Sequence, residues 1–193
     1  MFLLNPKDHQ RHYPDEESRQ IMEKTIAFFE NKGKARIKED DHELTWYADF
    51  IEFVKDEKIF STLLTPEKYG KDENARWDTW RNCGFNEILG FYGLAYWYTW
   101  QVSILGLGPI WMGKNEALKE KAAQHLEDGA IFAFGLSEQK HGADIYSSSM
   151  KLAPQEDGTY LANGEKYYIG NANVAPMVST FGKLTDSGDY VFF

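Results

Sequence analysis

Cysteine is almost missing from the sequence: Cys83 is the single one among 193 residues. A lone cysteine has no partner within the chain, which excludes a disulfide framework and favours the cytoplasm or another reducing compartment. Cys83 would act as a nucleophile only with a basic partner nearby in space, and a small, buried apolar side chain is the expected state. The segment from Met1 to Arg11 lacks a basic stretch followed by an apolar one, so no secretory signal peptide is predicted.

Positive charge is in deficit, with 21 Lys and Arg against 30 Asp and Glu and a formal net charge of −9. Neither the part before Gly129 nor the part after it has a net positive charge, so nucleic acid is not an expected partner. The sequence also has no Gly-x-Ser-x-Gly, no phosphate loop and no Gly-x-Gly-x-x-Gly. No catalytic residue is therefore assigned from a local motif.

Histidine and carboxylate spacing offers two weak metal patterns. His9 and His12 lie three residues apart, but a solvated N-terminal segment is the expectation for them. Glu138, His141 and Asp144 are also spaced by three. Because they fall in a glycine-bearing stretch between predicted strands, we expect a loop there and no metal site.

One long run lacks charged side chains, from Ile88 to Gly113, and it is long enough for a membrane helix. Its polar groups and its glycines argue against a span, since hydrocarbon offers no hydrogen-bond partners. A buried helix followed by a turn explains the same residues. The aromatic side chains in this run are accordingly expected to pack in a core: Tyr96, Trp97, Tyr98 and Trp100.

The first two-thirds of the chain shows helical spacing of apolar residues. The predicted helices run from Asp15 to Gly33, from Asp40 (with Glu43 in a capping box) through Val54, from about Ala75 through Phe85, within the uncharged run that follows, and from Asn115 to Glu127, with a short turn at Thr65–Gly70. After Gly129 the period changes to that of strands. The predicted strands cover 131–136, 145–152, 159–162, 165–169, 177–184 and 189–193.

Asn163-Gly164 is the strongest local signal among the strands, because Asn-Gly tolerates positive φ at both central positions of a tight hairpin turn. Helices followed by strands indicate an α+β fold with an antiparallel β-domain. We expect an all-helical domain over 1–129 and an incomplete β-domain over 130–193.

The end of the chain, Val191-Phe192-Phe193, is an apolar strand without a polar cap, which favours a fragment of a longer protein or a chain that needs another. A short terminal strand docked at a sheet centre is the alternative.

Two stretches carry a family resemblance: Phe132-Ala-Phe-Gly-Leu-Ser-Glu-Gln-Lys-His-Gly-Ala-Asp144 and Asn163-Gly-Glu-Lys-Tyr-Tyr-Ile-Gly-Asn-Ala172. Their order resembles the middle region of the acyl-CoA dehydrogenase family. Upstream, Leu63–Gly70, Gly106–Ile110 and Gly113–Lys119 resemble segments of the same family in the same order. The likeness extends from about Asp40 to Leu184, and this collinear arrangement is more specific than any single motif.

The resemblance implies a helical domain, a β-domain and a C-terminal four-helix bundle that hold FAD between them, with the bundle absent from this chain. It implies oxidation of an acyl-CoA thioester to a trans-2-enoyl-CoA in fatty-acid oxidation, with an electron-transfer flavoprotein as acceptor and a homodimer or homotetramer as assembly. In most relatives the catalytic glutamate lies in the bundle. No catalytic base is therefore assigned in this chain, and the chain alone is expected to show little or no turnover.

Carried across by position, the resemblance implies that Phe134, Leu136 and Ser137 lie beside the flavin ring, with the Ser137 hydroxyl and backbone groups as hydrogen-bond donors. Ala143 matches a position that is usually serine in relatives and contacts flavin phosphate or acyl-CoA. The cofactor-contacting triplet, usually Trp-Ile-Thr/Ser, is here Tyr168, Ile169 and Gly170.

Departures from the family pattern keep other readings open. Gly170 lacks the hydroxyl expected near the flavin, which admits an acyl-CoA oxidase or flavin monooxygenase relative. Lys140 and His141 could meet a CoA or flavin phosphate, and two exposed loop side chains are an equally good expectation. A non-catalytic module that binds a partner through an exposed strand edge is the third hypothesis.

Overall fold

The computed structural model describes residues 5–7 and 13–193. His9 and His12 lie outside the described residues. The chain divides into two units: one comprises the described residues up to Gln101 with Asn115–Ala130, and the other comprises Val102–Lys114 with Ile131–Phe193. We refer to them as the helical unit and the sheet unit, and helix α6 contributes to both.

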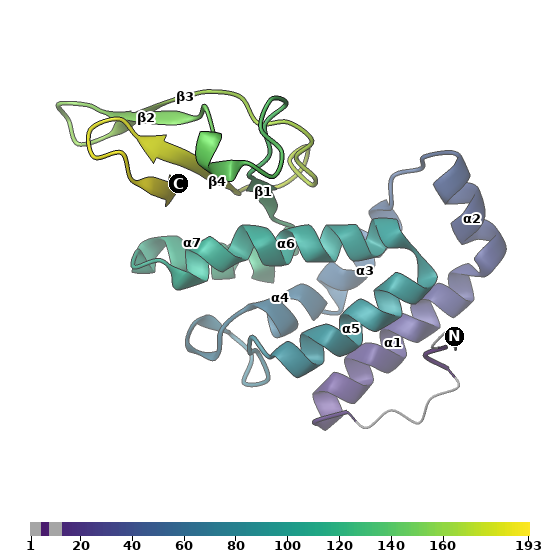
Figure 1. Ribbon diagram of the computed structural model, residues 1–193. Coiled ribbons are helices and arrows are strands. Elements are labelled where there is room, and N and C mark those ends of the chain that lie inside the picture. The colour runs from purple at the N-terminus through teal and green to yellow at the C-terminus, as the bar shows by residue number, and fades with distance from the viewer. Residues whose placement is uncertain (1–4, 8–12) are drawn as a thin grey trace. The chain divides into compact units, whose positions relative to one another are not determined.

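The helices occupy the first two-thirds of the chain, coloured purple to teal in Figure 1. They are α1 (Glu16–Lys32), α2 (Lys34–His42), α3 (Ala48–Asp56), α4 (Ile59–Leu64), the 3₁₀ turn η1 (Glu67–Tyr69), α5 (Thr79–Tyr92), α6 (Leu94–Met112) and α7 (Glu116–Glu127). No helix in the described part of the chain is long and apolar enough to cross a membrane.

Helices α1 and α7 begin and end close to the predicted bounds. Asp15 precedes α1, and its side chain accepts a hydrogen bond of 2.7 Å from the Ser18 amide. Gly33 ends α1 at φ +79°, a value that costs glycine little. Asn115 caps α7 by accepting a hydrogen bond of 3.1 Å from the Leu118 amide. The Asp15 and Asn115 side chains each satisfy an amide that the helix itself leaves unpaired, and both predicted helices are confirmed.

The predicted helix from Asp40 through Val54 is wrong, because the chain forms α2 and α3 there with a break between them. Leu44 has φ 55°, a left-handed value that no helix can continue through. Asp40 lies inside α2 rather than at a helix start, so the capping box with Glu43 does not form. Its carboxylate pairs instead with Lys32 at 2.8 Å and Arg36 at 2.8 Å.

The helix predicted from about Ala75 and the separate helix predicted in the uncharged run are confirmed as α5 and α6. The break between them lies inside the run, since α5 ends at Tyr92 and α6 begins after Gly93. The helix predicted from Ala75 begins only at Thr79, where the Asp78 side chain accepts from the Arg81 amide at 3.0 Å. The helix α6 includes Pro109 and continues to Met112, so the predicted turn falls after it.

Aromatic packing fills the helical unit. The Trp100 ring is fully buried, with centroids 5.0 Å from Phe60 and 4.6 Å from Phe85 in edge-to-face geometry. Tyr96 is buried, but Tyr98 is 43% exposed, so core packing holds for only part of the predicted aromatic group. The prediction of a buried Cys83 is wrong, because its thiol is exposed on α5.

The strands come last in the chain and form a mixed sheet, so the α+β order is confirmed while a wholly antiparallel sheet is not. The strands are β1 (Ala133–Gly135), β2 (Lys151–Pro154), β3 (Tyr160–Asn163), β4 (Val178–Leu184) and β5 (Tyr190–Phe192), with the 3₁₀ turn η2 (Ile145–Ser147) between β1 and β2. The order is β1-β4-β2-β3, with β5 also paired to β4 (Figure 1). Long connections precede β4, which allows it to lie parallel to β1 and β2. A tight turn follows β4, so β5 pairs with it antiparallel.

The hairpin predicted at Asn163-Gly164 is wrong. The antiparallel pair is β2 with β3, joined around Asp157-Gly158. Gly158 has φ +82°, and the Asp157 carboxylate accepts from the Thr159 amide at 2.9 Å, which is the chemistry of an Asx turn. β3 ends at Asn163, and residues 165–169 form no strand. The strand pair predicted for 177–184 and 189–193 is confirmed as β4 and β5.

A close approach of α6 to β1 leads to a stability prediction for Gly106. A Cβ on Gly106 would lie 2.5 Å from the backbone oxygen of Ala133, and its own carbonyl accepts a hydrogen bond from the Ser179 hydroxyl. Gly106→Ala should therefore separate helix from strand and lower the free energy of unfolding by about 1–3 kcal/mol. Gly108→Ala is the matched control, because nothing lies within 4 Å of its Cβ position. That variant should be neutral or stabilising by up to about 1 kcal/mol in urea denaturation; equal effects would contradict the close packing.

Candidate cofactor site on the sheet unit

The first predicted segment lies at the end of β1. The Phe134 ring stacks on Phe192 with centroids 5.3 Å apart, so it is held within the sheet. Leu136 and Ser137 follow the last residue of the strand, and Ser137 is exposed. Its hydroxyl forms no hydrogen bond with any described residue, which leaves it able to donate to a ligand.

The second predicted segment lies directly beside the first. The Tyr167 amide donates to the Ser137 carbonyl at 2.9 Å, and the Lys166 ammonium donates to the Leu136 carbonyl at 3.1 Å. Residues thirty apart in sequence are thus joined by two hydrogen bonds. The structure brings Leu136 and Ser137 together with Lys166 and Tyr167, the two residues that precede the 168–170 triplet.

The triplet itself is a surface turn rich in free donors. Tyr168 has φ 57° and is 84% exposed, with its ring edge-on to Tyr167 at 4.6 Å. The backbone N–H groups of Tyr168, Ile169 and Gly170 donate to no other described residue. Three consecutive amides and one serine hydroxyl form a donor set that suits the oxygen- and nitrogen-rich edge of a flavin ring.

Glu138 was not among the predicted site residues, yet it is the centre of the hydrogen-bond network beneath them. Its carboxylate pairs with Lys166 at 2.8 Å and accepts from the Ser149 amide at 2.7 Å and the Ser149 hydroxyl at 2.6 Å. The Ser148 hydroxyl and the Met150 amide donate to it as well. Burial alone would raise the pKa of Glu138, but the hydrogen bonds from Lys166, Ser148 and Ser149 hold that pKa well below its usual range.

Asn171 is a second residue that the sequence analysis did not single out. It is buried at φ 63°, and its side-chain amide donates to the Phe132 carbonyl at 2.9 Å. Its carbonyl accepts from the Val174 and Ala175 amides, so it closes the turn after Gly170. The signal in the sequence is the residue type, since asparagine adopts the left-handed region more readily than most others.

Ala143 stands apart from the other predicted site residues. It lies in the exposed loop after Glu138, where its carbonyl accepts from the Ile145 amide at 3.0 Å. No hydrogen bond in the described part of the chain joins it to the 134–137 or 168–170 segments. In the same loop Lys140 is exposed and His141 is half-buried, and the described residues contain no cluster of three metal-ligating side chains.

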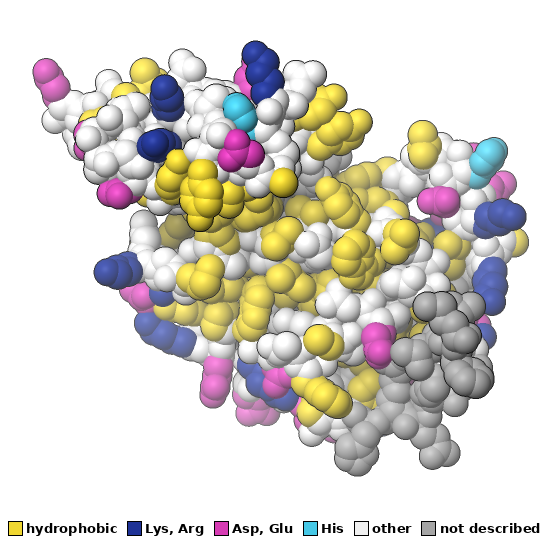
Figure 2. All heavy atoms as spheres, viewed as in Figure 1, with side chains coloured by type: hydrophobic (Ala, Val, Ile, Leu, Met, Phe, Trp, Pro, Cys, Tyr) yellow, Lys and Arg dark blue, Asp and Glu magenta, His cyan; other side chains and the backbone are white. Residues whose placement is uncertain are grey.

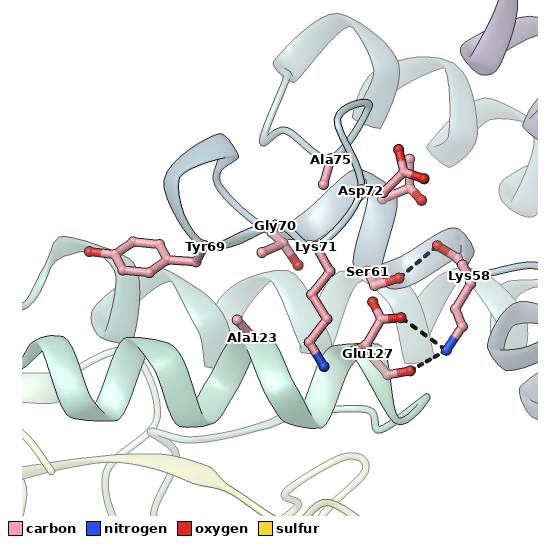
Figure 3. A pocket seen from close by; sticks show the side chains of 11 residues that line it. Lys58, Ser61, Tyr69, Gly70, Lys71, Asp72, Ala75, Ala123 and Glu127 are labelled. Atoms are coloured by element: carbon pink, nitrogen blue, oxygen red, sulfur yellow. Dashed lines mark hydrogen bonds and ion pairs between the residues drawn. The ribbon is translucent and has the colours of Figure 1, made fainter.

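Two hollows lie in the helical unit. One, of about 180 Å³, is polar, and its lysines are paired: Lys58 meets the Glu127 carboxylate at 3.1 Å, and Lys71 donates to Gln124 at 2.7 Å (Figure 3). The other, of about 670 Å³, is mainly apolar and has five aromatic side chains in its wall: Trp46, Tyr47, Phe91, Tyr92 and Tyr96. Neither hollow includes a predicted cofactor-site residue.

Comparisons with known proteins identify relatives along most of the chain. No family model matches. The short-chain specific acyl-CoA dehydrogenase of Megasphaera elsdenii is 31% identical over 162 residues, which cover 82% of this chain and 42% of the relative. The mitochondrial very long-chain specific acyl-CoA dehydrogenase of Rattus norvegicus is 31% identical over 100 residues, which cover 50% of this chain and 15% of that protein.

Solved structures of acyl-CoA dehydrogenases superpose on this chain. Butyryl-CoA dehydrogenase from Megasphaera elsdenii superposes with a TM-score of 0.77 at 26% identity, over 93% of this chain and 47% of the other. An acyl-CoA dehydrogenase complexed with FAD from Bacillus anthracis shares the fold, with a TM-score of 0.68 at 22% identity, over 99% of this chain and 32% of the other. The chain thus spans less than half the length of these relatives. It is a homologue of the acyl-CoA dehydrogenases and corresponds to the N-terminal portion of their fold, which confirms the resemblance found in the sequence.

Proposed function

We propose that this chain is the N-terminal portion of an FAD-dependent acyl-CoA dehydrogenase that oxidises an acyl-CoA thioester to a trans-2-enoyl-CoA in fatty-acid oxidation. The observation that carries the proposal is the bond between the Tyr167 amide and the Ser137 carbonyl, which places two donor-bearing segments side by side. The homology to enzymes that act on acyl-CoA supplies the reaction class.

In this proposal the sheet unit binds and orients the flavin. FAD, when bound, supplies the acceptor for the hydride that leaves the substrate. The Ser137 hydroxyl and the amides of Tyr168, Ile169 and Gly170 donate hydrogen bonds to the edge of the ring, where negative charge develops during reduction. No residue of this chain is assigned as the base that removes the α-proton.

The rest of the assembly is proposed from the family. The helical part (1–129) and the β-part (130–193) are its first domain and the beginning of its second, and an electron-transfer flavoprotein and a homo-oligomer complete the system. On α6, four exposed side chains at helical spacing form an apolar stripe: Leu94, Tyr98, Leu105 and Met112. Figure 2 shows hydrophobic side chains gathered on the face where α6 lies. We propose that the family's helical bundle covers this stripe.

Cofactor binding is the first test of this function. Titration of the flavin-free complete protein with FAD should quench flavin fluorescence with saturation, because this chain contributes donors to the site. Ser137→Ala should weaken FAD by about three- to tenfold, the worth of one hydrogen bond. Ser187→Ala, an exposed serine in the turn between β4 and β5, should not change the affinity. No saturable binding, or equal effects of the two variants, would contradict the proposal.

The reaction is tested in the complete protein by anaerobic addition of acyl-CoAs of several chain lengths. Bleaching of the flavin absorbance supports a dehydrogenase, and unchanged absorbance with every length contradicts it. Gly170 favours one second candidate, an acyl-CoA oxidase, because the side-chain hydroxyl of the usual triplet is missing. Rapid oxygen consumption with peroxide release would identify that activity.

A further inference from the structure

We propose that Glu138 and Lys166 are positioning residues for the flavin site: their buried ion pair fixes the end of β1 against the 167–170 turn. We call this pair the Glu138–Lys166 clip. The inference rests on the proposed FAD site and extends it to two residues that touch neither the 168–170 amides nor the Ser137 hydroxyl.

The clip spans the two segments directly. Glu138 follows Ser137 in sequence, and Lys166 precedes Tyr167. The Lys166 ammonium has three protons, and three acceptors surround it: the Leu136 carbonyl at 3.1 Å, the Glu138 carboxylate at 2.8 Å and the Ser148 hydroxyl at 3.1 Å. One cation thereby holds both the backbone of Leu136 and the side chain of Glu138.

The pair is built for rigidity, because it is buried and its carboxylate is saturated. The side chains of Lys166 and Glu138 are only 8% and 4% exposed. The Oε1 atom that pairs with Lys166 also accepts from the Ser148 hydroxyl and the Met150 amide, and Oε2 accepts from the amide and the hydroxyl of Ser149. A fully satisfied buried network has one geometry, so the distance between the segments that it joins is fixed as well.

Replacing both charges of the clip by neutral side chains distinguishes a positioning role from a merely structural one. In Glu138→Gln/Lys166→Met, no unpaired charge is left behind, so folding should largely recover. The tether from Lys166 to the Leu136 carbonyl is still lost. The two donor segments can then shift relative to each other, and a ligand that contacts both loses affinity even though the fold survives.

The test uses the complete protein, with FAD as the probe. The double variant should bind FAD about tenfold or more weakly and change the visible absorption of the bound flavin, while its far-UV circular dichroism stays that of the wild type. Hydrogen exchange gives a readout without flavin: the Tyr167 amide should lose protection, while amides between β2 and β3 keep it. Lys151→Met and Glu165→Gln, exposed charges in the sheet unit, serve as controls and should change neither readout.

The outcomes separate the two proposals. Wild-type FAD affinity together with a protected Tyr167 amide in the double variant would overturn the clip. If the wild type binds no FAD while Tyr167 protection still depends on the pair, the flavin function fails and the clip between the segments is supported.

Discussion

Lys166→Met should lower the free energy of unfolding of the sheet unit by about 3–5 kcal/mol at neutral pH. The change removes the cation that pairs with Glu138, whose side chain is 4% exposed, and leaves a carboxylate charge in a site of low dielectric. It also leaves the Leu136 carbonyl without the ammonium proton that it accepts at 3.1 Å. Urea denaturation followed by amide exchange in β4 measures the effect, and Lys151→Met should stay within about 0.5 kcal/mol of the wild type.

The cost of Lys166→Met should shrink in acid. In the wild type the pKa of Glu138 is lowered on folding, so this residue contributes stability above its ordinary pKa of 4.5, and that contribution is lost as the pH falls through the lower folded value. In the variant the carboxyl can take up a proton at higher pH, because the buried charge has no partner. The stability difference between wild type and variant should therefore be greatest near pH 7 and decrease below about pH 4.5. A difference that grows on acidification would contradict a buried ion pair.

Local chemistry explains which parts of the fold the sequence could predict. Asp15 and Asn115 accept from amides three residues on, and the Gly33 amide donates to the Phe29 carbonyl four residues back, so the helices that they bound were predicted correctly from local sequence. The break at Leu44 was not predicted, because Asp40 looks like a helix start. In the structure it lies inside α2 and pairs with Lys32 at the end of α1 and with Arg36 in α2. An ion pair across a helix junction has no signature in the pattern of apolar residues.

The Asn-Gly hairpin failed for a similar reason. Turn propensity favours a hairpin at Asn163-Gly164, but β2 already supplies the antiparallel partner of β3 through Asp157-Gly158. Segment 165–169 is then held by Lys166 and Tyr167 against the end of β1. Both Gly-containing turns have suitable residues, and tertiary pairing decides which one becomes a hairpin.

The candidate site was predicted from a resemblance, and the network that supports it was not. Ser137 and the 168–170 triplet stay predictions as flavin contacts, and the structure shows that their segments adjoin. Glu138 and Lys166 were among the residues that carried the resemblance, yet their pairing depends on a contact between positions 28 residues apart in sequence. A single sequence contains no signal that these two particular charges meet.

Trp100→Ala should destabilise the helical unit by about 3–5 kcal/mol, because it removes a fully buried ring that lies edge-to-face with Phe60 and Phe85. Trp100→Phe should cost less than about 1.5 kcal/mol. It keeps most of the ring volume and removes the indole N–H, which has no hydrogen-bond partner among the described residues. Trp80→Ala is the matched control, since Trp80 is 69% exposed on α5 and its removal should cost about 0.5 kcal/mol or less. Urea unfolding followed by circular dichroism ranks the three variants. If Trp100→Phe lowers the free energy of unfolding as much as Trp100→Ala, the indole N–H does bond in solution and the packing assigned to Trp100 is wrong. If Trp80→Ala lowers it as much as either Trp100 variant, the exposed aromatic surface of α5 is covered in solution.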